Sequence, residues 1–281
     1  MEELAAKQVL LDFEIIALIT LFAGVVTFAL VRRRYPRVLE TSRDFDGFDL
    51  VLMFLPSLLF LINPLFAVML AGKELEVSGV ESDQQAVGTL FVNITYFLFV
   101  GVMTFGIIEW VRNRRIVDLF GLKRLSLPLV IIYTIFGGVA SLVICAWALG
   151  GISQELMDRV FTELAAQESV ETLQTSDSIL FLVISIIMAC VAAPLVEELL
   201  FRGYMYGAVK QATNPIFAAV VIGALFSVVH GNLPALLPLW GFSILLCLAY
   251  EWTRCLWVPI GMHAFFNAAN IVFMFVPQAA E

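Results

Sequence analysis

The chain has 281 residues, and 61% of them are hydrophobic, whereas soluble globular domains contain about 45–50% apolar residues. Only 14% are charged, against about 25% in an average protein. This composition excludes an ordinary water-soluble fold, and the formal net charge of -8 argues against a nucleic-acid partner.

Long uncharged segments follow one another along the chain. They cover residues 15–31, 50–72, 84–108, 125–154, 178–196, 211–250 and 255–280. Most of them reach the roughly 20 apolar residues that cross a hydrocarbon core. The segment 211–250 is about twice that length and contains Gly231, Asn232 and Pro234, which favour a break between two helices. Because these segments lack the alternating pattern of barrel strands, we predict an all-α, polytopic transmembrane bundle of about eight spans.

The positive charges are distributed unevenly between the two ends of the predicted spans. Twelve of the 16 lysines and arginines fall on one side, namely Arg32, Arg33, Arg34, Arg37, Arg43, Arg112, Arg114, Arg115, Lys123, Arg124, Lys210 and Arg254. Loops rich in lysine and arginine remain in the cytoplasm. We therefore expect a multi-pass protein of a cell membrane, of prokaryotic type, with its basic loops cytoplasmic and both termini outside the cytoplasm.

Ionisable residues inside the spans are confined to the second half of the chain. Residues 1–177 hold four predicted spans and a polar external loop, with no motif that we recognise. Residues 178–281 hold the other four spans and nearly every charged or titratable side chain within them. We therefore expect residues 178–281 to form a four-span core that carries the functional site.

Three apolar segments in this half carry the polar residues. Glu197, Glu198 and Arg202 lie in the fifth span, and His230 and His263, which are the only histidines of the chain, lie in the sixth and eighth. Asn267 follows His263 by one helical turn. A charged side chain within a bilayer costs about 2.5–3.5 kcal/mol on insertion scales. Such residues are rarely kept without a purpose, so we predict that they share one functional site.

Helical spacing suggests how the fifth span is used. Residues four apart share a helix face, and a glutamate placed before its cation is the favoured order, so Glu198 and Arg202 are predicted to pair. Glu197 points about 100° away from Glu198 and is left to face a cavity, where a carboxylate can act as a general base toward water. If this helix continues to Lys210, Glu197 and His230 lie at similar depth.

The remaining residues suggest an oxyanion site and leave the question of a metal open. His263 and Asn267 can present two polar groups to one point, as stabilisation of an oxyanion requires. Phe226 is expected to pack against His230. Two histidines and one glutamate also match the ligand count of a catalytic zinc site, although the HExxH motif is absent. Zinc and a metal-free glutamate mechanism are both compatible with these residues, and no metal ligand is assigned.

The order of these motifs resembles that of the CPBP family. The motifs are Glu197-Glu198-x-x-x-Arg202, Phe226-x-x-x-His230 and His263-x-x-x-Asn267. The family comprises type II CAAX prenyl endopeptidases and bacteriocin-processing or immunity proteins, and it is also called the Abi family. The resemblance covers about residues 178–275. It implies an intramembrane endopeptidase in which Glu197 activates water with help from His230, and His263 and Asn267 stabilise the oxyanion.

Three functions are compatible with this pattern. The first is hydrolysis of a peptide bond in a membrane-associated protein or peptide, with the lipid bilayer as the other partner. The second is a proton-coupled transporter, since buried glutamate and histidine also form proton relays. The third is a non-catalytic scaffold or immunity protein that keeps the polar cluster for packing. A transporter is expected to contain inverted repeats, which this sequence lacks, and a scaffold would never cut a peptide bond.

Overall fold

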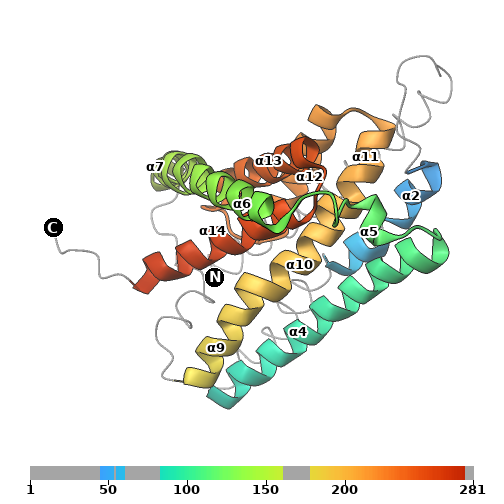
Figure 1. Cartoon of the computed structure of the whole chain (residues 1–281). Coiled ribbons are helices and arrows are strands. Elements are labelled where there is room, and N and C mark those ends of the chain that lie inside the picture. Colours follow the sequence, from blue (N-terminus) through green and yellow to red (C-terminus); the bar gives the residue numbers. More distant parts are fainter. Residues whose placement is uncertain (1–44, 54, 61–82, 161–177, 276–281) are drawn as a thin grey trace.

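The computed structural model describes residues 45–53, 55–60, 83–160 and 178–275, and Figure 1 shows their arrangement. Within these ranges the regular secondary structure is helical and contains no strand, so the predicted all-α class is confirmed. The predicted first span, residues 15–31, and the basic segment after it lie outside the described residues.

Five described helices are long and apolar enough to cross a membrane. They are Leu90–Val111, Leu127–Met157, Ile179–Ala212, Leu236–Thr253 and Trp257–Phe275, and Gly47–Phe60 and Pro215–Val228 are shorter apolar helices. Large apolar side chains cover the outside of the bundle, including Trp110, Trp147 and Trp252, each more than three quarters exposed. Extended apolar surface of this kind is rare on soluble monomers. The chain is therefore a multi-pass membrane protein.

One long helix carries the first polar motif. It consists of α9 (Ile179–Ile187), η3 (Met188–Ala192), α10 (Ala193–Glu198), η4 (Leu199–Met205) and α11 (Tyr206–Ala212). The helix starts where the Ser178 hydroxyl accepts a hydrogen bond from the Phe181 amide, and it continues past Lys210 as predicted. In Figure 1 it runs beside α4 (Asp83–Gly106). The segments η3 and η4 are π-helical, a local widening that is frequent at functional sites.

The predicted break in segment 211–250 is confirmed. The segment forms a hairpin of α12 (Pro215–Val228) and α13 (Leu236–Thr253), and Gly231 adopts a positive φ of 60° between them. The Asn214 side chain caps the start of α12, with Pro215 at the first helical position. With 14 residues, α12 is about 21 Å long at 1.5 Å per residue. It is therefore shorter than the roughly 30 Å hydrocarbon core, and the sixth predicted span is a short helix.

The last helix packs closely against the first half of the chain. Helix α14 (Trp257–Phe275) lies against α6 (Leu127–Ser141), which continues through η2 (Leu142–Leu149) into α7 (Gly150–Val160). A Cβ atom on Gly138 would lie 2.4 Å from the Phe265 ring, and one on Gly261 would lie 2.4 Å from the Thr134 hydroxyl. Only glycine permits this approach. The two predicted regions are thus in tight contact, and their division at residues 177 and 178 stays a prediction.

The basic turns that are described gather at one end of the bundle. Lys210 in the last turn of α11 and Arg254 after α13 both bind the Glu251 carboxylate, each at 2.6 Å. The segment that contains α5 (Ile116–Leu119) joins them, because the Leu256 amide donates to the Phe120 carbonyl. The charge pattern correctly placed these turns on one side. That this side faces the cytoplasm stays a prediction.

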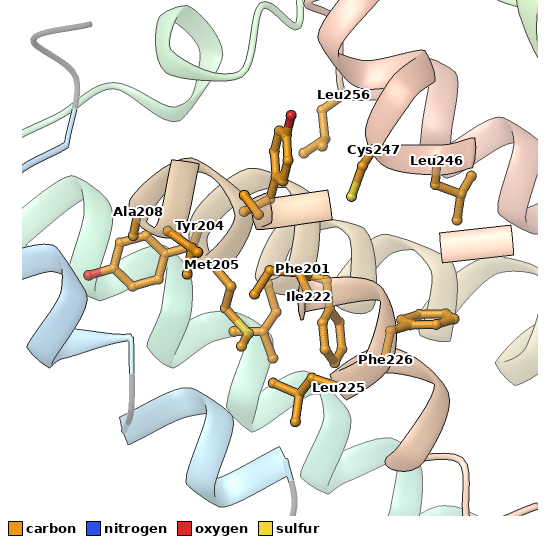
Figure 2. Close-up of a cluster of buried hydrophobic side chains, with 14 of the residues drawn as sticks. Phe201, Tyr204, Met205, Ala208, Ile222, Leu225, Phe226, Leu246, Cys247 and Leu256 are labelled. Carbon is orange, nitrogen blue, oxygen red and sulfur yellow. The ribbon is translucent and has the colours of Figure 1, made fainter. Parts of the chain in front are cut away.

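The apolar core brings the motif-bearing helices together. Figure 2 shows Phe201 of η4, Ile222 and Phe226 of α12, and Leu246 of α13 around one centre. The Phe201 and Phe226 rings meet edge to face with centroids 5.2 Å apart, which is a favourable aromatic geometry. Glu198 and Arg202 of the first motif are fully buried beside this core, with the Arg202 guanidinium over the Phe226 ring.

Candidate active site

The first feature of the site is a fully buried ion pair. Arg202 Nη1 lies 2.8 Å from Glu198 Oε1, and both side chains are inaccessible to solvent. The guanidinium carbon lies 4.4 Å from the centre of the Phe226 ring, within the range of a cation–π contact. The predicted pairing of Glu198 with Arg202 is confirmed.

Glu198 also holds His263. The Nδ1 atom of His263 lies 2.8 Å from Glu198 Oε1, so this oxygen accepts from both the guanidinium and the imidazole. Since a carboxylate oxygen only accepts, we assign the imidazole hydrogen to Nδ1. The Nε2 atom of the neutral ring then carries a lone pair. Edge-to-face contacts with Phe226 and Phe242, at 5.7 and 5.5 Å between centroids, restrict the ring further.

A backbone carbonyl fixes His230 in the same tautomer. His230 Nδ1 lies 2.6 Å from the Phe226 carbonyl oxygen, one turn earlier in the chain. A carbonyl can only accept, so the hydrogen again belongs on Nδ1 and the Nε2 lone pair points away. The Phe226 and His230 rings pack with centroids 4.6 Å apart. The expected packing between these two residues is confirmed.

The Glu197 carboxylate faces both imidazoles. Its Oε2 atom lies 3.9 Å from His230 Nε2 and 4.0 Å from His263 Nε2, which is too far for a direct hydrogen bond. Oε2 is buried and has no hydrogen-bond partner among the described residues. Three acceptor atoms from three helical segments thus converge on one point. The prediction that Glu197, His230 and His263 lie close together is confirmed. A hydrogen-bond donor placed between their acceptor atoms would satisfy them.

The three side chains of the site differ in exposure. The His230 side chain is 29% exposed, whereas those of Glu197 and His263 are 7% and 4% exposed. His230 follows the end of α12 and precedes the short connection to α13. His230 is thus the most exposed of the three side chains.

Asn267 has a partner that the sequence did not predict. Its Nδ2 atom donates to the Ala189 carbonyl in η3, at 2.8 Å. This bond connects α14 to the π-helical turn that precedes the glutamates. It engages one of the two N–H groups of the amide. A shared oxyanion site formed by Asn267 and His263 stays a prediction.

The arrangement does not fit a zinc site. Among residues 45–53, 55–60, 83–160 and 178–275, no group of three or more histidine, cysteine or acidic side chains is placed to hold a metal ion. Ligand atoms on a tetrahedral zinc are about 3.4 Å apart with bonds near 2.1 Å. The Glu197 carboxylate is 3.9 and 4.0 Å from the two imidazole nitrogens. We therefore derive no reaction step through a metal.

One polar contact of the site escaped the sequence analysis. Ser243 of α13 accepts a hydrogen bond from Arg202 Nη2 at 2.7 Å. A lone serine in an apolar helix gives only a weak signal, because its hydroxyl can bond within its own helix. Nothing in the spacing of Ser243 and Arg202 along the chain indicates that they meet.

Fold and site together define a class of protein. The chain is a helical, multi-pass membrane protein with a buried glutamate facing two histidines, and a second glutamate paired to arginine orients one of them. Residues 179–269 match the family described as type II CAAX prenyl endopeptidase Rce1-like. The resemblance to the CPBP family that the three motifs predicted is confirmed over this region.

Two curated bacterial proteins are similar to this chain. The protein named "Putative membrane peptidase YdiL" from Bacillus subtilis is 30% identical over 111 residues, which are 40% of this chain and 46% of that protein. The "Membrane-embedded CAAX protease MroQ" from Staphylococcus aureus is 28% identical over 153 residues, or 49% of this chain and 62% of that protein. The chain thus spans about half the length of the curated relatives that it matches. Both names describe membrane proteases.

No solved structure matches the chain significantly. The family match and the two relatives, with the site geometry, are therefore what indicates a membrane peptidase.

Proposed function

We propose that this protein hydrolyses a peptide bond in a membrane-associated protein or peptide, using water activated by Glu197. The observation that carries the proposal is the position of Glu197 Oε2, buried and unpartnered among the described residues, 3.9 and 4.0 Å from two imidazole nitrogens. A water molecule bonded to two such atoms at about 2.8 Å can bridge this separation. The family match and the names of both relatives support the same activity.

In the proposed reaction, Glu197 acts as general base and then as general acid. Its carboxylate takes a proton from the water as the water oxygen bonds to the carbonyl carbon of the substrate. The resulting tetrahedral intermediate carries its negative charge on the former carbonyl oxygen. Glu197 then returns the proton to the leaving amine, and the C–N bond breaks. Positioned acid–base groups of this kind accelerate reactions by about 10²–10⁴-fold.

The two histidines have different roles in this scheme. His230 Nε2 accepts the second hydrogen of the water and so orients it, since its Nδ1 is held by the Phe226 carbonyl. His263 Nε2 can donate to an oxyanion only when the ring is protonated. The Glu198 carboxylate at 2.8 Å from Nδ1 orients the His263 ring, in the way a buried carboxylate orients the histidine of a catalytic triad.

The test is cleavage by purified protein in lipid vesicles that contain a library of membrane peptides. Mass spectrometry of new C-termini should find products with wild-type protein and none with Glu197→Gln. The control is Glu155→Gln, which removes an exposed carboxylate from the middle of α7 and should cleave normally. Wild-type cleavage by Glu197→Gln would contradict the assignment of the base. Absence of any product that depends on Glu197 would favour the transporter or scaffold hypothesis.

A further inference from the structure

Arg202 is held by a second helix besides its own. Its Nη2 atom donates to the Ser243 hydroxyl at 2.7 Å and lies 3.4 Å from the Ser243 carbonyl oxygen. Both side chains are fully buried. Ser243 lies in α13, which carries none of the three sequence motifs, so neither the motifs nor the family match assigns it a role.

Ser243 is the end of a continuous chain of hydrogen bonds. Arg202 Nη2 binds Ser243, Nη1 binds Glu198 Oε1, and the same oxygen accepts from His263 Nδ1. The chain joins α13, the long helix of α10 and η4, and α14. His263 Nε2 at its far end faces Glu197. Among the four residues of this hydrogen-bond series, only His263 faces Glu197. Ser243 can therefore act on the site only through Arg202, Glu198 and His263.

We propose that Ser243 is a positioning residue, which fixes the Arg202 guanidinium and thereby holds His263 in the tautomer with Nδ1 protonated. The effect of Ser243 on catalysis rests on the proposed function, whereas its effect on the His263 tautomer does not.

The hydroxyl is the group that matters in this proposal. Arg202 Nε already lacks a hydrogen-bond partner among the described residues. Removal of the Ser243 hydroxyl would leave a second buried donor of the same guanidinium without its side-chain acceptor. Buried donors left unpaired are costly, so the guanidinium is expected to turn and share its hydrogen bonds differently. Glu198 Oε1 then moves with Arg202, and His263 loses its fixed acceptor.

The molecule supplies an internal reference. His230 is held by the Phe226 carbonyl of its own helical segment and not by the chain that starts at Ser243. The protein contains only these two histidines. Nitrogen-15 labelling of histidine alone therefore gives one resonance pair for each ring, in the whole protein.

The experiment is ¹⁵N NMR of the full-length, histidine-labelled protein in lipid nanodiscs, at a pH about two units above the ordinary histidine pKa. Wild-type protein should show both rings with Nδ1 protonated, and the His230→Gln variant assigns the remaining signals to His263. In Ser243→Ala we expect the His263 ring to populate both tautomers, with Nδ1 and Nε2 shifts moving toward each other. The His230 signals should not change.

Two matched variants separate positioning from general loss of structure. Ser243→Thr keeps the hydroxyl and should keep the single tautomer of His263. Ser141→Ala removes an equally buried hydroxyl, one that bonds only to the Gly137 carbonyl of α6 in the described structure, and should leave both rings as in wild type. If Ser243→Ala or Ser243→Thr does not fold, Ser243→Cys, with its weak sulfur acceptor, should show partial mixing. An unchanged His263 tautomer in Ser243→Ala or Ser243→Cys would overturn the proposal, as would an equal change in Ser141→Ala.

Activity provides the second readout. If the protein cleaves peptides, Ser243→Ala should lower kcat by about tenfold with KM unchanged. This is the lower end of the range for residues that orient a functional histidine from behind. A lower kcat with an unchanged His263 tautomer contradicts positioning through His263. A mixed tautomer in a protein that cleaves nothing supports the positioning of His263 and contradicts the proposed function.

Discussion

Asp49 in the first half of the molecule and Glu197 in the second are both buried carboxylates, but their hydrogen-bond partners differ. In the first half, Asp49 of α2 (Gly47–Leu52) is almost inaccessible, yet both its oxygens have partners. Arg112, after η1 (Ile107–Val111), donates to Oδ1 at 2.8 Å and to Oδ2 at 3.1 Å, and the Asp46 amide also donates to Oδ2. In the second half, Glu197 Oε2 has no partner among the described residues and faces two imidazoles.

This difference separates a structural ion pair from a candidate site. A buried carboxylate whose oxygens are both satisfied has no remaining capacity to bind a ligand, and its role is to connect two helices. A buried carboxylate that keeps an unpaired oxygen costs stability, and such strain persists mainly where it serves function. The predictions that follow test this contrast.

The largest expected effect is on catalysis. Glu197→Gln should lower the cleavage rate by about 10²–10⁴-fold, because the amide cannot take a proton from water. Asp49→Asn should leave kcat unchanged for each folded molecule, because Asp49 pairs with Arg112 and is not part of the site around Glu197. Rates are measured after size-exclusion chromatography has selected the folded protein. An equal loss of kcat in Asp49→Asn would remove the distinction between the two clusters.

The next effect is on stability, and it is again larger in the second half of the chain. Arg202→Ala leaves Glu198 charged, fully buried and without its cation, which typically costs about 3–5 kcal/mol. Arg112→Ala should cost less, because the Arg112 side chain is 15% exposed and Asp49 keeps the hydrogen bond from the Asp46 amide. Unfolding free energies in mixed micelles give both values. A greater loss in Arg112→Ala than in Arg202→Ala contradicts this order.

A smaller effect concerns Asp46 and depends on pH. Burial raises its pKa, but hydrogen bonds from Arg112 and from the Phe48 and Asp49 amides outweigh burial, so the pKa lies below its ordinary value. The resulting stabilisation is present above the unfolded pKa of about 3.9 and is lost as the pH falls through the lower folded value. Because Asp46 is half exposed, solvent screening limits it to about 1 kcal/mol or less.

The measurement for Asp46 is the difference in unfolding free energy between wild type and Asp46→Asn. It should be positive at neutral pH and vanish at a pH below the folded value. A difference that does not change with pH would mean that the charge of Asp46 contributes nothing.

The smallest expected effect is that of a chelator. Incubation with a strong zinc chelator should leave the cleavage rate unchanged, since the Glu197 and histidine atoms are too widely spaced for tetrahedral zinc. Metal analysis of the same sample is the control. Loss of activity on chelation, with recovery on adding zinc, would mean that Glu197, His230 and His263 hold a metal. It would contradict the metal-free general-base mechanism.

The sequence predicted contacts that follow helical periodicity. Glu198 and Arg202 pair because they are four residues apart on one helix, and Phe226 packs on His230 for the same reason. The length of segment 211–250 and the sequence Gly231-Asn232-Leu233-Pro234 within it also predicted the break between two helices. Each of these depends on local geometry that does not change with the tertiary fold.

Contacts between distant helices could not be predicted in the same way. Arg202 meets Ser243, and Arg112 meets Asp49, only because helices pack side by side. Asn267 binds Ala189 in η3, which is π-helical, and nothing in that apolar stretch signals a π-turn. Helix α12 is short because it starts only at Asn214-Pro215. The continuous hydrophobic segment 211–250 did not indicate this length.

The central claim is that one water molecule lies between the Glu197 carboxylate and the two imidazoles and donates its two hydrogens to Glu197 Oε2 and His230 Nε2. The most direct measurement is an experimental structure of the protein in lipid nanodiscs at a resolution that reveals ordered water. The account predicts Glu197 Oε2 near 3.9 and 4.0 Å from the two Nε2 atoms, with water density between them. A Glu197 side chain turned toward the acyl chains, or separated from either imidazole by a packed apolar side chain, would contradict it.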